Sequence, residues 1–213
     1  MTEPGAQHTP LDLLPVAVLR RRALAVSAAA VAVGAVAGAV VGVFVGRPYG
    51  LVVGVVLGVP LLVLATAEAR RRSWLRDGVV SVRAIGTRSV DLRHATAIEL
   101  LVSETRGMRA VGVLVSGPPK GRTLNIAVAA YSGGGGAELD ILALRRLADA
   151  LAAGSGTDGL VFAELLVAQL RAEAQDLPAA GRPLFRIAAT APAGRLAHRI
   201  RAEAVGRFVA TLD

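Results

Sequence analysis

The side chains that most often carry chemistry are sparse in this sequence. The three histidines, His8, His94 and His198, lie far apart, and none stands in the HxxxH or HExxH spacing with which a helix holds a metal ion. The chain has no cysteine, which excludes disulfides, thiol nucleophiles and thiolate metal sites. No serine occupies a G-x-S-x-G turn, which would expose a nucleophile. We therefore predict no catalytic residue, no cofactor and no metal site, and expect that the protein is not an enzyme.

Four consecutive glycines, residues 133–136, precede a predicted helix and invite comparison with a phosphate-binding loop. Backbone N–H groups at a helix N-terminus attract anions. However, no Lys-Ser or Lys-Thr pair follows the glycines, and Glu138 and Asp140 place two negative charges in the first turn. These carboxylates would repel a phosphate and already complement the helix dipole. We expect a turn here, with phosphate binding as the alternative.

The elements that must position any site begin with a long apolar segment. Residues 23–46 and 50–67 contain no charged side chain, and only Arg47-Pro48-Tyr49 separates them. About 20 helical residues cross a hydrocarbon core of about 30 Å. The sequence therefore predicts an N-terminal arm over residues 1–22 and a two-helix transmembrane hairpin over residues 23–72, with Pro60 as a kink.

Glycines recur at four-residue intervals in both apolar runs. The two rows are Gly34, Gly38, Gly42 and Gly46, then Gly50, Gly54 and Gly58. A period of four places each row on one helix face, where small residues let two backbones approach closely in lipid. We predict that the rows pack the two helices against each other. The alternative is that one row forms a homodimer face.

Arginines flank the predicted hairpin at both ends. They are Arg20, Arg21 and Arg22 before the first span, then Arg70, Arg71, Arg72 and Arg76 after the second. The positive-inside rule therefore places both termini of this multi-pass protein in the cytoplasm, at the cell's inner membrane. We also expect these arginines to contact anionic lipid headgroups. A secretory signal or a twin-arginine signal is the alternative, but the first run is about twice as long as a signal's apolar region.

The formal charge of +8 does not indicate nucleic-acid binding. Residues 1–72 contain seven arginines against three acidic residues, so half of the excess lies beside the predicted spans. Aromatic residues make up only 3% of the chain, and no basic run alternates with them. We predict no nucleic-acid partner.

Beyond the hairpin, the periodicity predicts an α+β domain over residues 73–153. The second helix is expected to continue through residues 68–76. Alternating apolar residues then predict five antiparallel strands, at residues 79–84, 88–92, 97–104, 110–116 and 123–131. An amphipathic helix over residues 138–152 would close this small sheet. Residues 154–213 are predicted to form an all-helical tail, with a first helix at residues 158–175.

The order of these parts resembles the bacterial pleckstrin-homology-like membrane proteins over about residues 24–153. In that family, an apolar strand pair around a turn glycine precedes a strand that packs under a C-terminal helix. The matching residues here are Val82, Gly86, Val90, Ile98 and Leu101, with the helix at residues 139–151. The sequence departs from the pattern in showing five predicted strands where a full barrel has seven. Residues 154–213 have no counterpart.

The resemblance implies a membrane-associated binding or scaffold module without an assigned ligand. In pleckstrin-homology domains that bind inositol lipids, the first strand pair carries basic residues, and Arg83, Arg88 and Arg93 stand at that place here. The alternative is that they are ordinary solvent-facing residues. We expect an anionic membrane surface as partner and leave open a protein partner of the cytoplasmic domain and a homo-oligomer. A small transporter or channel accessory subunit is the alternative function, although no ionisable or amide side chain lines the spans.

Overall fold

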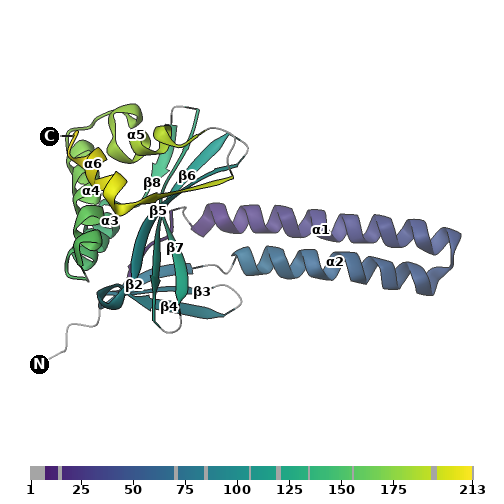
Figure 1. Cartoon of the computed structure of the whole chain (residues 1–213). Coiled ribbons are helices and arrows are strands. Elements are labelled where there is room, and N and C mark those ends of the chain that lie inside the picture. Colours follow the sequence, from purple (N-terminus) through teal and green to yellow (C-terminus); the bar gives the residue numbers. More distant parts are fainter. Residues whose placement is uncertain are drawn as a thin grey trace, which may run out of the picture. The chain divides into compact units, whose positions relative to one another are not determined.

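A computed structural model describes residues 8–13, 16–69, 72–83, 86–105, 107–118, 121–133, 135–154, 156–192 and 196–212 of the 213-residue chain. The chain divides into two compact units (Figure 1). We call the first the helical hairpin; it holds the two N-terminal helices. The second, the α+β unit, combines residues 8–13 with nearly all described residues from Arg72 onwards. The unit is not divided at residue 153, so the predicted tail packs with the sheet.

The helical hairpin consists of α1 (Val16–Phe44) and α2 (Arg47–Ala69). Gly46 turns the chain between them with φ of +117°, a conformation that favours glycine. Pro48 fits the first turn of α2, because that position needs no N–H donor. Leu24–Phe44 and Arg47–Ala65 are long and apolar enough to cross a membrane, as the sequence predicts. Only 11% and 17% of these segments is buried, which is unlike the core helix of a soluble protein.

Glycine backbones form the seam between α1 and α2. A Cβ atom on Gly38 would lie 2.8 Å from the carbonyl oxygen of Gly50, and one on Gly34 would lie 2.9 Å from that of Gly54. No side chain larger than hydrogen fits at such separations. The two rows therefore face each other within one chain. Gly46 is the exception, since its nearest neighbours are Pro48 and Tyr49 of the turn.

The α+β unit begins with a four-stranded sheet. Its strands are β1 (Thr9–Pro10), β2 (Arg72–Arg76), β3 (Val79–Arg83) and β4 (Thr87–Asp91), in the order β1-β2-β3-β4. The predicted helical extension over residues 68–76 is wrong, because α2 ends at Ala69 and β2 follows. Asp77 and Gly78 both have positive φ, so this Asp-Gly pair forms a two-residue hairpin turn rather than a helix stop.

A five-stranded antiparallel sheet follows. Its strands are β5 (Ala97–Thr105), β6 (Met108–Gly117), β7 (Arg122–Ser132), β8 (Gly135–Glu138) and β9 (Ala197–Arg201), in the order β8-β7-β6-β5-β9. Leu100 of β5 pairs with Val113 of β6, which in turn pairs with Ile126 of β7. All three side chains are buried. β5 to β7 lie within two residues of their predicted bounds, whereas β8 and β9 were not predicted.

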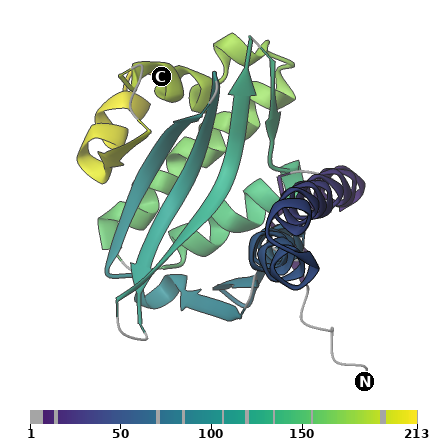
Figure 2. The same cartoon turned by 90° about the vertical axis from the view of Figure 1, so that its right-hand side faces the viewer.

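Helices cover one face of the five-stranded sheet (Figure 2). They are α3 (Ile141–Ala152), α4 (Gly156–Ala174), α5 (Pro183–Thr190) and α6 (Ala202–Val209), with 3-10 turns at Leu92–His94 and Ala179–Gly181. Asp140 caps α3 by accepting a hydrogen bond from the N–H of Leu142, at 3.1 Å. Leu144, Leu147 and Phe162 are buried beneath the sheet in one continuous core.

The all-helical description of residues 154–213 is therefore wrong. β9 extends the sheet along the free edge of β5, where Ile200 pairs with Leu100. The sequence AHRIR gives little strand signal, because two of its five residues are arginines and only Ile200 is buried. The coarser prediction of an α+β unit with an antiparallel sheet is confirmed.

Candidate functional sites

The predicted lipid-contacting arginines fall into two groups. Arg20, Arg21 and Arg22 lie in the helical backbone of α1, but their side chains lie outside the described part of the chain, as do residues 70 and 71 altogether. Arg72 is half-buried and lies 3.6 Å from the Asp12 carboxylate. Arg76 is exposed and pairs loosely with Asp77, at 3.5 Å. Of these two arginines, Arg76 has the more exposed side chain, whereas Arg72 is engaged within the fold.

The two segments that flank the helical hairpin are bound to each other in what we call the clasp, residues 9–13 with residues 72–76. Leu11 donates its N–H to the Ser73 carbonyl oxygen at 2.9 Å, and the Ser73 hydroxyl donates to the Leu11 carbonyl oxygen at 2.9 Å. The Ser73 N–H donates to Asp12 Oδ1, also at 2.9 Å. His8 stacks on Trp74. Leu11 itself is buried, so this short segment is part of the core rather than a free arm.

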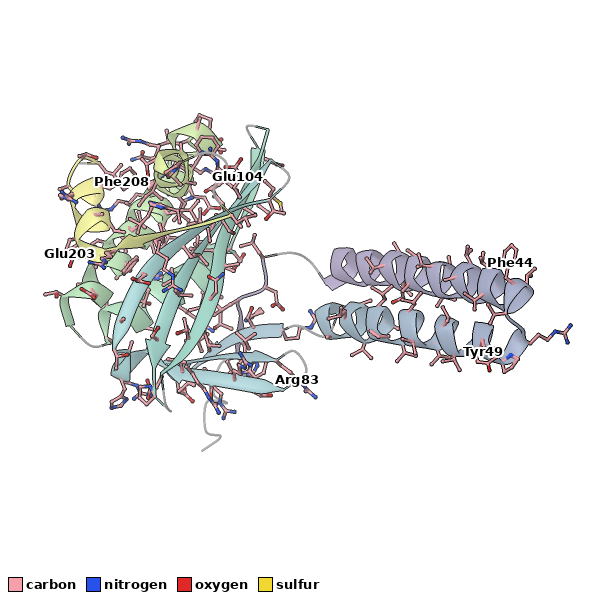
Figure 3. The ribbon with its side chains drawn as sticks, turned by 45° about the vertical axis from the view of Figure 1, so that its right-hand side comes forward. Phe44, Tyr49, Arg83, Glu104, Glu203 and Phe208 are labelled. Atoms are coloured by element: carbon pink, nitrogen blue, oxygen red, sulfur yellow. The ribbon has the colours of Figure 1, made fainter. Side chains whose placement is uncertain are left out.

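The arginines around β3 and β4 differ in their surroundings. Arg83 ends β3 and is exposed, as Figure 3 shows, and Arg88 on β4 is also exposed. Arg93 is instead held by the Asp77 carbonyl oxygen and the Asp91 carboxylate. Burial raises the pKa of Asp91, but hydrogen bonds from the Arg93 N–H and the His94 ring outweigh it, and the net result is a lowered pKa. Arg93 therefore ties the turn after β4 to the Asp77–Gly78 turn, although more than half of its side chain remains exposed.

A buried polar cluster that the sequence did not reveal joins β7 and β8 to the α4–α5 connection. Glu138 lies at its centre with a side chain that is only 8% exposed. The Tyr131 hydroxyl donates to one oxygen of Glu138 at 2.7 Å, and the Arg182 guanidinium donates to the other. Arg182 also donates through Nε to the Leu177 carbonyl oxygen, at 2.8 Å. We call Tyr131, Glu138, Glu173 and Arg182 the polar cluster.

The three residues of the polar cluster other than Glu138 all have raised pKa values. Burial, the hydrogen bond to Glu138 and its charge raise the pKa of Tyr131. Burial and then the negative charge of Glu138 raise the pKa of Glu173, one oxygen of which is buried without a hydrogen-bond partner. The hydrogen bond to Glu138 raises the pKa of Arg182. Because both oxygens of Glu138 are already hydrogen-bonded, Glu138 links β8 to β7 and to the α4–α5 connection and is not free to act as a base.

The glycine run does not form an anion-binding helix terminus. Gly133 turns the chain with positive φ, and Gly135 begins β8, so the glycines join two strands. Asp140 already occupies the N-terminus of α3. The phosphate-binding alternative is therefore contradicted at this place. Among the residues that the structure describes, no group of three or more acidic, histidine or cysteine residues is arranged to hold a metal ion.

Comparisons with known proteins give no relative: no family model, curated protein or solved structure matches this chain.

Proposed function

We propose that this protein is an integral inner-membrane protein in which the helical hairpin spans the bilayer and the α+β unit is a cytoplasmic binding or scaffold module. The clasp carries this proposal. Because residues 9–13 and 72–76 pair within one folded unit, we infer that both ends of the hairpin emerge on the same side of the membrane. The arginines around these two ends favour the cytoplasm as that side.

The turn of the hairpin supports a membrane-spanning role. Phe44 and Tyr49 lie at the turn, at the opposite end from the chain termini of the hairpin (Figure 3). Both are exposed, with 84% and 61% of their surfaces accessible. Aromatic residues with a nearby arginine favour the interface between hydrocarbon and water. The exposed valines and leucines along α1 and α2 would form a large apolar patch in water, which soluble monomers avoid.

The order of elements in the α+β unit supports a pleckstrin-homology-like module. Between residues 72 and 138, the described residues form seven strands, β2 to β8, and α3 follows directly. This is two strands more than the sequence predicted, and it agrees with the strand number of a full pleckstrin-homology barrel. The hydrogen-bonded pairing separates the strands into two sheets after β4, and β9 adds an edge strand. We therefore propose a pleckstrin-homology-like module elaborated by residues 154–213.

The topology is testable with reporter fusions to the full chain. Reporters at the N-terminus and the C-terminus should both read as cytoplasmic, and one inserted after Gly46 should read as periplasmic. Alkaline extraction of membranes should leave the protein in the pellet. Termini on opposite sides, or release of the chain by alkali, would refute the proposal.

An anionic lipid surface is the partner that we propose for the module. Arg76, Arg83 and Arg88 are its exposed basic residues on β2 to β4. Each arginine close to such a surface adds about 1 kcal/mol of attraction. In detergent-solubilised full-length protein, binding to vesicles with anionic lipid should fall as salt rises and should weaken in the Arg76→Gln, Arg83→Gln, Arg88→Gln variant. Matched changes at Arg145, Arg171 and Arg207, which are exposed on the covering helices, should leave binding unchanged. Equal loss in both variants would show that only net charge matters.

A further inference from the structure

An open groove runs along one side of the helical hairpin. Its volume is about 680 Å³, which lies within the range of about 300–1,000 Å³ that is typical of ligand pockets. The glycine seam forms its floor, and aliphatic side chains form its walls. The walls are Val31, Ala35, Ala39 and Val43 from α1, and Leu51, Val55, Val59 and Leu62 from α2.

The groove exists because of both the seam and the small residues beside it. The glycines bring the two backbones so close that the flanking side chains stand up as walls. On α1, Ala35 and Ala39 directly follow Gly34 and Gly38 and are exposed, so this wall is low in its middle. The wall from α2 carries larger residues throughout. An elongated apolar hollow results.

The dimensions and the chemistry of the groove match one lipid chain. From Val31 to Val43 the α1 wall rises about 18 Å at 1.5 Å per residue, and one leaflet of a bilayer core is about 15 Å thick. Only Arg47, at the turn end, adds a charge to the lining. Arg47 is exposed and begins α2, whose first turn has no acidic residue. A helix N-terminus and a guanidinium both favour an anion, and guanidinium binds phosphate in a bidentate manner.

We propose that the groove binds one acyl chain of a phospholipid from the leaflet at the hairpin turn, and that Arg47 binds the phosphate of that lipid. The proposal rests on the membrane-spanning hairpin of the proposed function. Phe44 and Tyr49 lie at the turn of the hairpin (Figure 3). Tyrosine favours the membrane interface, so in a spanning hairpin Arg47, two residues before Tyr49, would lie at headgroup depth. A second copy of the hairpin fits less well, because two such grooves related by a two-fold axis would meet hollow against hollow.

The test uses the full chain, purified from membranes in mild detergent, delipidated and titrated with phosphatidylglycerol under native mass spectrometry. We expect one phosphatidylglycerol per chain. The Ala35→Leu, Ala39→Leu variant fills the groove and should lose the bound lipid. Arg47→Gln should weaken binding by roughly tenfold, since hydrogen bonds to a charged group are lost. Ala32→Leu adds the bulk of one of these leucines to α1 at an exposed position outside the groove and should bind as the unmodified chain does.

Diacylglycerol, which has the same chains without a phosphate, should bind the unmodified chain and the Arg47→Gln variant equally weakly. Equal lipid binding by the groove-filled variant and the Ala32→Leu control would overturn the proposal. So would a lipid-free dimer that the groove-filled variant abolishes, since a second copy would then occupy the groove. Alkaline extraction distinguishes failure of the proposed membrane-spanning function from failure of the lipid-binding inference. A chain released by alkali refutes the proposed function, whereas a resistant chain that retains no phosphatidylglycerol refutes this inference alone.

Discussion

The polar cluster should be a major determinant of stability in the α+β unit, and replacing Arg182 by methionine tests it. The change removes the cation from Glu138, whose side chain is only 8% exposed, and also the hydrogen bond from Arg182 Nε to Leu177. Removing one partner of a buried ion pair costs about 3–5 kcal/mol. Because Arg182 itself is 21% exposed, we expect about 3 kcal/mol, including about 1 kcal/mol for the lost hydrogen bond to the Leu177 carbonyl oxygen.

The double variant separates the charge from the packing. Glu138→Gln keeps an acceptor for the Tyr131 hydroxyl, which donates at 2.7 Å, but removes the buried negative charge. Arg182→Met combined with Glu138→Gln should therefore recover about 1–2 kcal/mol relative to Arg182→Met alone, because no uncompensated carboxylate remains. The penalty of Arg182→Met should also shrink as the pH falls through the raised pKa of Glu173, because one of the two negative charges beside the lost cation then disappears.

Urea unfolding of the full chain in mild detergent provides the measurement. Trp74 is the only tryptophan and lies in β2, so its fluorescence reports on the α+β unit. Two outcomes would refute the reasoning. One is a cost below about 1 kcal/mol for Arg182→Met, and the other is a double variant no more stable than Arg182→Met.

Three further predictions concern other parts of the chain. Gly38→Leu should destabilise the hairpin by roughly 1–2 kcal/mol in detergent, because a Cβ there would lie 2.8 Å from a backbone oxygen of α2. Gly42→Ala, where the nearest atom would lie at 3.8 Å, should be tolerated, and equal melting temperatures for the two variants would contradict this. Burial and Glu138 raise the pKa of Glu173 in the folded state, so its charge opposes folding above that pKa. Glu173→Gln should therefore raise the melting temperature at neutral pH, with a gain that vanishes as the pH falls below the ordinary pKa of a glutamate. Asp12→Ala removes the hydrogen bond that Asp12 accepts from the Ser73 N–H and the ion pair with Arg72, and should cost about 1–2 kcal/mol, with faster proteolysis before α1 and an unchanged rate within α4.

The sequence predicted the hairpin and the long strands correctly because the hydrophobic pattern is strong in these segments. Leu100, Val113 and Ile126 stand in alternating runs, and tertiary packing did not override that period. β2 was missed because its residues follow a helix and include two arginines, so the sequence resembles a charged helix end. The Asp77-Gly78 pair did not resolve this ambiguity, because such a pair is compatible with both a helix stop and a hairpin turn.

The polar cluster could not have been predicted from the chain alone. Its four residues are spread from Tyr131 to Arg182, and only the fold brings β8 beside the start of α5. Glu138 was interpreted as a first-turn residue of a helix, whereas it ends a strand. The sequence located the arginines around β3 and β4, but it could not show which of them are held by contacts within the fold. Arg93 looked equivalent to Arg83 and Arg88 until the structure showed that Asp77 and Asp91 engage it.

The clasp also constrains the order in which the protein can be assembled on the ribosome. Leu11 and Ser73 are 62 residues apart, so at about 5–20 residues per second β1 waits roughly 3–12 s for its partner strand to be made. An unstructured loop of that length would make the closure entropically costly. A hairpin that has already formed returns the chain to its starting side and removes most of that cost. If the hairpin spans the membrane as proposed, insertion of α1 and α2 would precede completion of the first sheet, and a chain whose hairpin fails to insert would expose the unpaired edge of β2.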